Sequence, residues 1–138
     1  MPHSYLLATY LHLARAAGLR RRPLVRDKLL LLAASVAAAS DLAPVAEACR
    51  AEILRHNPHH LLKRWPSFAA AAADEEFETF VNQLRRHYPP ERAEQLLDSL
   101  QVDPARERET YFHDGEYAAA LLGRTWDDLQ REFGRGNS

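Results

Sequence analysis

Cysteine is nearly absent from this chain of 138 residues, since Cys49 is the only one. No disulfide can form within the chain, and a zinc site built from several cysteines is excluded. A lone cysteine is typical of proteins in a reducing compartment, so we expect the protein to be cytoplasmic. Val45, Cys49 and Ile53 follow one another at helical spacing. We therefore expect Cys49 to be a small buried hydrophobic residue and not a reactive thiol.

Long apolar runs are also lacking. The longest, from Leu29 to Ala39, is interrupted by Ser35. It reaches about half of the ~20 residues that a membrane-spanning helix needs. We therefore expect no spanning segment and no membrane partner.

Glycine is scarce, with five residues, and β-branched residues are sparse, whereas Ala, Leu, Arg and Glu dominate. These abundant residues favour helices, so the sequence predicts an all-α fold, a compact bundle of about six or seven helices built from helical hairpins. The length fits a single domain, which we expect over residues 1–134, followed by a disordered tail over residues 135–138. Arginine far outnumbers lysine, which together with the abundant alanine is typical of a bacterial protein from a GC-rich genome.

Apolar periodicity and capping residues predict where the helices lie. The first is expected over residues 5–17, closed by Gly18, and the second over residues 24–39. The second is apolar on nearly every side, which predicts a central helix. Asp41 is expected to cap the third helix. Further helix starts are expected at Ser67, Asp74, Asp103, Asp114 and Thr125.

Two expected helix ends have nearly the same sequence, Ile53 to Pro58 and Leu84 to Pro89. Each contains Arg-His, one further residue and a proline, and a repeat of this period is typical of stacked helical hairpins. Residues 28–58 resemble a single tetratricopeptide hairpin. The matching packing positions are Leu30, Ala33, Ala34, Ala37, Ala46, Ile53 and Pro58. The resemblance implies binding of a peptide or protein in a groove between helices. The alternative is a bundle containing one hairpin that is alike only through shared packing.

Positive charge is concentrated at the start of the chain. Residues 1–28 carry six basic groups and one acid, a net charge of +5, so the remainder carries −6 to give the total of −1. A basic segment on an acidic body can contact nucleic acid or anionic lipid. Within the segment Arg15–Lys28, the candidate nucleic-acid residues are Arg20, Arg21, Arg22 and Arg26. A solvated, arginine-rich corner between helices is the simpler alternative.

The segment from His56 to Phe68 has the most unusual composition, rich in histidine, proline and basic groups around one tryptophan. Tryptophan and arginine are favoured anchors at interfaces. We therefore predict a partner-binding patch formed by His59, His60, Arg64 and Trp65. The alternative is a connector in which Trp65 and Phe68 fill the core.

Metal ligation is not expected in that segment. His56 and His59 have the spacing of helical ligands, but Pro58 lies between them and their neighbours are basic. We expect no metal and no cofactor there or elsewhere in the chain.

His113-Asp114 is the dipeptide that names the HD phosphohydrolase superfamily, which is also all-α. This resemblance implies a metal-dependent enzyme in which His87 and Asp127 supply further ligands. However, the chain has no Gly-rich phosphate loop and no G-x-S-x-G motif. We therefore expect a non-catalytic adaptor or scaffold domain that binds a protein partner or a second copy of itself. The enzyme and the accessory nucleic-acid binder remain alternatives.

Overall fold

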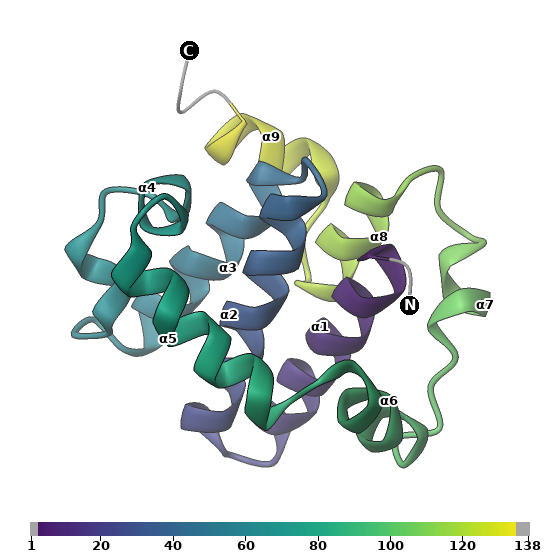
Figure 1. Ribbon diagram of the computed structural model, residues 1–138. Coiled ribbons are helices and arrows are strands. Elements are labelled where there is room, and N and C mark those ends of the chain that lie inside the picture. The colour runs from purple at the N-terminus through teal and green to yellow at the C-terminus, as the bar shows by residue number, and fades with distance from the viewer. Residues whose placement is uncertain (1–2, 135–138) are drawn as a thin grey trace.

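The computed structural model describes residues 3–134, which form helices joined by short connections (Figure 1). The α-helices are α1 (His3–Leu19), α2 (Pro23–Ala39), α3 (Ala43–His56), α4 (Phe68–Ala72), α5 (Glu75–His87), α6 (Pro90–Asp98), α7 (Pro104–Arg108), α8 (Asp114–Leu121) and α9 (Trp126–Phe133). A short 3-10 helix, η1 (Leu61–Arg64), lies between α3 and α4, and no strand occurs among the described residues. All of these α-helices except α4 and α7 have eight residues or more, which confirms the predicted all-α helical bundle. The predicted tail, residues 135–138, lies outside the described residues.

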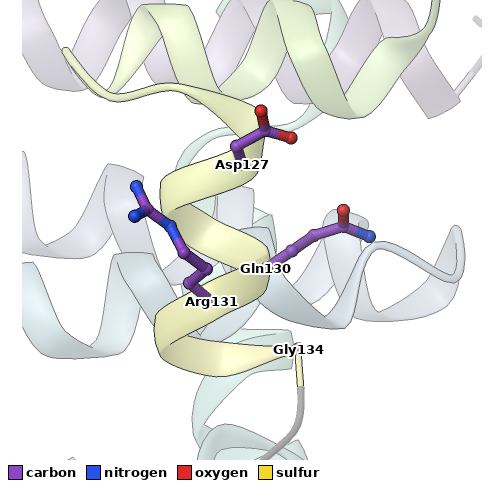
Figure 2. A pocket seen from close by; sticks show the side chains of 4 residues that line it. All are labelled: Asp127, Gln130, Arg131 and Gly134. Carbon is purple, nitrogen blue, oxygen red and sulfur yellow. The ribbon is translucent and has the colours of Figure 1, made fainter.

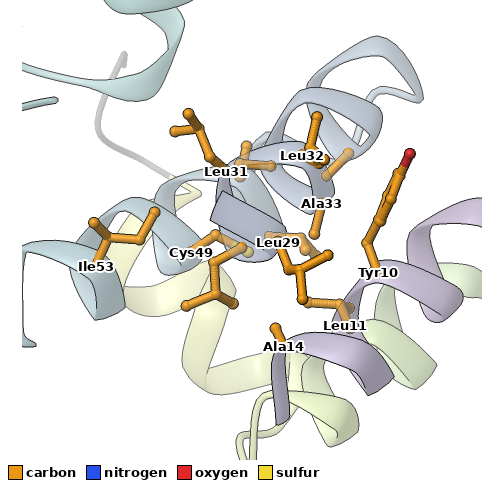
Figure 3. Close-up of a cluster of buried hydrophobic side chains, with 14 of the residues drawn as sticks. Tyr10, Leu11, Ala14, Leu29, Leu31, Leu32, Ala33, Cys49 and Ile53 are labelled. Carbon is orange, nitrogen blue, oxygen red and sulfur yellow. The ribbon is translucent and has the colours of Figure 1, made fainter. Parts of the chain in front are cut away.

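Helix α2 is the centre of the fold. Its residues from Leu29 to Ala34 are each at most 4% exposed, and α1 and α3 pack along it. Alanines of α2 let both neighbours approach closely, and the apolar side chains of the three helices meet in one cluster (Figure 3). Cys49 lies in this cluster, and burial raises the pKa of its thiol to about 12. The predictions of a central second helix and of a buried cysteine are therefore confirmed. A raised pKa keeps the thiol protonated at neutral pH.

The remaining helices surround this three-helix centre. Helix α4 packs on α3, and α5 packs on α2 and α4. On the other side of the molecule, α6, α7 and α8 contact α1, while α9 contacts α3 and α8 (Figure 1). The hydroxyl of Tyr10 in α1 donates a 2.6 Å hydrogen bond to the carbonyl of Tyr88, which ties the end of α5 to the centre. None of the described helices is long and apolar enough to cross a membrane.

The C-terminal ends of α1, α2 and α8 have the same geometry. Each contains a backbone hydrogen bond of 2.9 Å in which an N–H donates to the carbonyl five residues earlier. The donors are Arg22, Leu42 and Arg124. This Schellman ending places the residue before the donor in the left-handed region, where glycine is favoured. Those residues are Arg21 (φ 57°), Asp41 (φ 59°) and Gly123 (φ 74°). Only α8, of these three helices, has the glycine that the ending favours.

Two sequence predictions are wrong at these ends. Gly18 does not close the first helix, which continues to Leu19 and turns at Arg21. Asp41 does not cap α3, because it occupies the left-handed position after α2, and Leu42 precedes α3 without a side-chain cap. In both cases the short corner is shaped by the end of the preceding helix.

Arg21→Gly is expected to raise the free energy of unfolding by about 0.5–1 kcal/mol, because glycine adopts a positive φ without a clash of its Cβ atom. Urea denaturation followed by circular dichroism measures the change. The matched control is Arg20→Gly, one residue earlier, where no positive φ is relieved. An equal gain in both variants would contradict the explanation.

Candidate functional site

The predicted partner-binding segment lies between α3 and α4. The Nδ1 atom of His60 accepts a 3.1 Å hydrogen bond from the N–H of Leu62 and so caps η1. Burial lowers the pKa of His60, and the charge of Asp27 offsets only part of this effect. His59 is exposed beside it. His60 therefore stabilises the start of η1, whereas the adjacent His59 faces solvent.

The side chains of Trp65 and Arg64 both form hydrogen bonds within the protein. The indole Nε1 of Trp65 donates to Asp74 at 3.1 Å, and its ring lies edge-on to Phe77 with centroids 5.3 Å apart. Arg64 donates two hydrogen bonds of 2.9 Å to the carboxylate of Glu76. These hydrogen bonds from Arg64 lower the pKa of Glu76.

The connector is also fixed from α3. A guanidinium nitrogen of Arg50 donates to the carbonyl of Trp65 at 2.8 Å. The carboxylate of Glu47 accepts hydrogen bonds from the N–H groups of Phe68 and Ala69 at 2.7 Å and 3.2 Å. These contacts fit the alternative in which the segment is a connector that fills the core, and a partner role for His59, His60, Arg64 and Trp65 stays a prediction.

A groove with an apolar floor lies beside this connector, between α2, α4 and α5. We call it the α2–α5 groove; its volume is about 340 Å³. It is lined by Ser35, Ala38, Ala39, Phe68, Ala72, Phe77, Glu78, Val81 and Arg85. The floor is formed by Phe68, Phe77 and Val81, each at most 3% exposed. The walls are mainly alanine, and Ala38, Ala39 and Ala72 are exposed, whereas the floor is almost fully covered.

The basic candidates are divided between two environments. Arg20, Arg21 and Arg22 are exposed at the corner between α1 and α2. Arg26 is different, because its side chain is 17% exposed and its guanidinium lies 3.4 Å from the carboxylate of the buried Asp27. The structure therefore groups three of the four predicted nucleic-acid residues at one corner and assigns Arg26 to an internal ion pair.

His113 and Asp114 both hold local structure at the start of α8. The Nδ1 atom of His113 accepts a 3.1 Å hydrogen bond from the N–H of Glu116, so His113 and not the predicted Asp114 is the cap. Asp114 accepts a 2.7 Å hydrogen bond from Arg108. His113 and Asp127 line one cavity of about 500 Å³, which His87 does not line. Among the described residues, no group of three His, Cys, Asp or Glu side chains is placed to hold a metal ion.

A larger but open depression of about 780 Å³ lies on α9. Its described lining is Asp127, Gln130, Arg131 and Gly134, and Figure 2 shows Gln130 and Arg131 extending to opposite sides of α9. Arg131 is paired with Asp128 on the same helix. Polar side chains that do not converge give this depression no defined chemistry.

A polar cluster that the sequence did not predict joins α1, α7 and α8. Glu107 accepts hydrogen bonds from the Tyr117 hydroxyl at 2.7 Å and from His12 Nε2 at 2.8 Å. Burial, and then the hydrogen bond to Glu107, raise the pKa of Tyr117, so its hydroxyl remains a donor. The cluster anchors the five-residue helix α7 to the centre of the fold.

The stabilising effect of Glu107 should depend on pH. Burial alone would raise its pKa, but the hydrogen bonds from Tyr117 and His12 outweigh burial and hold the pKa below the ordinary value of 4.5. The ionised form therefore stabilises the fold above about pH 4.5, and this contribution is lost as the pH falls through the lowered pKa. Its size should stay below about 1 kcal/mol, because solvent screens a carboxylate whose side chain is 44% exposed.

Glu107→Gln is expected to lower the free energy of unfolding at neutral pH and to have a diminishing effect as the solution is acidified. Urea denaturation at a series of pH values measures this. Glu109→Gln, at an exposed neighbour, is the control and should have little effect at any pH. A difference between wild type and Glu107→Gln that does not change with pH would contradict the assignment.

Comparisons of the chain with protein-family models, with curated proteins and with solved structures gave no match. The α2–α3 hairpin includes most of residues 28–58, and its tetratricopeptide resemblance stays a prediction.

Proposed function

We propose that the chain is a non-catalytic protein-interaction domain whose α2–α5 groove receives an amphipathic helix of a partner protein. The observation that supports this most is the groove itself, a hollow of about 340 Å³ between three helices whose exposed apolar residues are Ala38, Ala39 and Ala72. Apolar grooves between helices accept the apolar side chains of an incoming helix. Burial of the partner's apolar side chains against the exposed alanines provides the driving force for binding.

The alanines explain how a helix would fit. Ala38, Ala39 and Ala72 are exposed along the walls, and their small side chains leave room for larger side chains of a partner. Burying apolar surface there requires no rearrangement of the floor.

The rim of the groove determines which helix fits. Glu78 and Arg85 both project from α5 and lie seven residues apart, hence on the same face of that helix. They carry opposite charges about 10 Å apart along the helix axis. A partner helix with a basic residue near Glu78 and an acidic residue near Arg85 would be selected in one orientation.

A display library of random helix-forming peptides tests the proposal. Peptides enriched on the wild-type protein should carry apolar residues at helical i, i+3 or i+4, and i+7 positions. They should lose at least about tenfold in affinity for Ala72→Trp, which fills the groove and removes more than about 1.4 kcal/mol of binding.

The matched control is Ala69→Trp, on the same helix but outside the groove. It should bind the peptides as the wild type does, and circular dichroism checks that both variants fold. Enriched peptides that bind Ala72→Trp as tightly as Ala69→Trp, or the absence of any enrichment, would overturn the proposal.

A further inference from the structure

The corner between α1 and α2 combines two features that are seldom exposed together. Leu19 and Leu24 are 79% and 70% exposed, although both are large and apolar. Between them lie Arg20, Arg21 and Arg22, which are also exposed. We call these five residues the basic corner.

The positive charge of the basic corner is uncompensated. None of its three guanidinium groups has a hydrogen bond or an ion pair with another residue in the described part of the chain. Arg15 and Lys28 add exposed charges one helical turn beyond Leu19 and Leu24. Asp27 is the one acid within residues 15–28, and it is 4% exposed.

The corner has an arginine at a backbone position that favours glycine. Arg21 occupies the left-handed position of the α1 ending with φ 57°, where α8 has Gly123. A side chain at such a position costs stability relative to glycine. Asp41 and Gln101 adopt the same conformation, with φ 59° and 57°, so the exposed charge and the two leucines, and not the strain, distinguish the basic corner.

Although the sequence predicts no membrane partner, we propose that the basic corner docks the protein on an anionic membrane surface. The arginines would contact lipid phosphates, while Leu19 and Leu24 enter the apolar layer below the headgroups. A nucleic acid would satisfy the arginines but offers no apolar layer for two leucines. The anionic bilayer complements both the charge and the exposed apolar area, so it is the occupant that the geometry favours.

This surface contact is compatible with the proposed interaction groove. Leu24 and Ala38 lie near opposite ends of α2, fourteen residues and about 21 Å apart along the helix. Docking through the basic corner therefore leaves the α2–α5 groove open. The two proposals rest on separate surfaces, and either can fail without the other.

Vesicle sedimentation with the full chain tests the inference. The protein should bind vesicles that contain phosphatidylglycerol in phosphatidylcholine, should not bind phosphatidylcholine alone, and should be released by high salt. Each cation near an anionic surface contributes about a fivefold change in partitioning. Replacing Arg20, Arg21 and Arg22 together by alanine should therefore reduce binding by about two orders of magnitude.

Three further variants separate the apolar contribution to vesicle binding from the electrostatic one. Leu19→Ser with Leu24→Ser should weaken vesicle binding while leaving its salt dependence unchanged. Arg21→Gly should weaken binding about fivefold even though it stabilises the fold, so loss of structure cannot explain the result. Arg86→Ala, an exposed arginine at the end of α5, is the matched control and should bind normally.

Two results would overturn the proposal. One is the absence of binding to phosphatidylglycerol vesicles at low salt. The other is vesicle binding that survives the triple arginine change or is indifferent to both leucines. If duplex DNA or RNA binds instead, and binding is lost with the arginines but not with the leucines, the corner is a nucleic-acid site.

Discussion

Phe77→Ala is expected to lower the free energy of unfolding by about 3–5 kcal/mol. Phe77 is 2% exposed and its ring contacts three others. The centroids of Trp65 and Phe68 lie 5.3 Å and 5.6 Å away, both edge-on, and that of Phe80 lies 6.5 Å away. Truncation removes the shared partner of these rings and leaves a cavity between the connector, α4 and α5.

Urea denaturation followed by circular dichroism measures this loss. Phe112→Ala is the matched control, because Phe112 is 93% exposed and the same change there should stay within about 0.5 kcal/mol. If Phe77→Ala were as mild as Phe112→Ala, the aromatic cluster would not stabilise the fold.

Leu31→Ala is expected to cost about 2–5 kcal/mol. Leu31 is 0% exposed in the middle of α2, where α1 and α3 leave little room for the surroundings to collapse into the cavity. The size of the loss within this range reports how rigidly the three-helix centre is held.

The control for Leu31→Ala comes from the same helix. Leu24→Ala makes the same chemical change at a side chain that is 70% exposed, so it should alter stability by less than about 0.5 kcal/mol. Thermal or urea unfolding of the two variants gives the comparison directly. Similar losses at both positions would contradict the assignment of α2 as the buried centre.

Much of this helical architecture could be predicted from local sequence. The central position of α2 follows from its all-round apolar pattern. Several helix starts follow from caps that act within three residues. Ser67, Asp74, Asp103 and Thr125 each accept a backbone hydrogen bond as predicted. Such features depend on neighbours in the chain, and periodicity or composition reveals them.

The candidate sites depend on contacts that periodicity does not report. The His12–Glu107 contact joins residues 95 positions apart, and the α2–α5 groove is formed by three separate segments. The exposure of Trp65 could not be predicted either, because it depends on contacts with Asp74, the N-cap of α5, and with Phe77 inside α5. Exposed leucines at the basic corner are equally invisible, since leucine usually predicts burial.

The central proposal is that the α2–α5 groove binds a partner helix. Amide chemical-shift mapping of the chain with a peptide enriched by selection tests it most directly. We expect the largest shifts around Ala38, Ala72 and Val81, with little change at the basic corner. Shifts confined to His59–Trp65 or to Arg20–Arg22, with an unchanged spectrum along the groove, would contradict it.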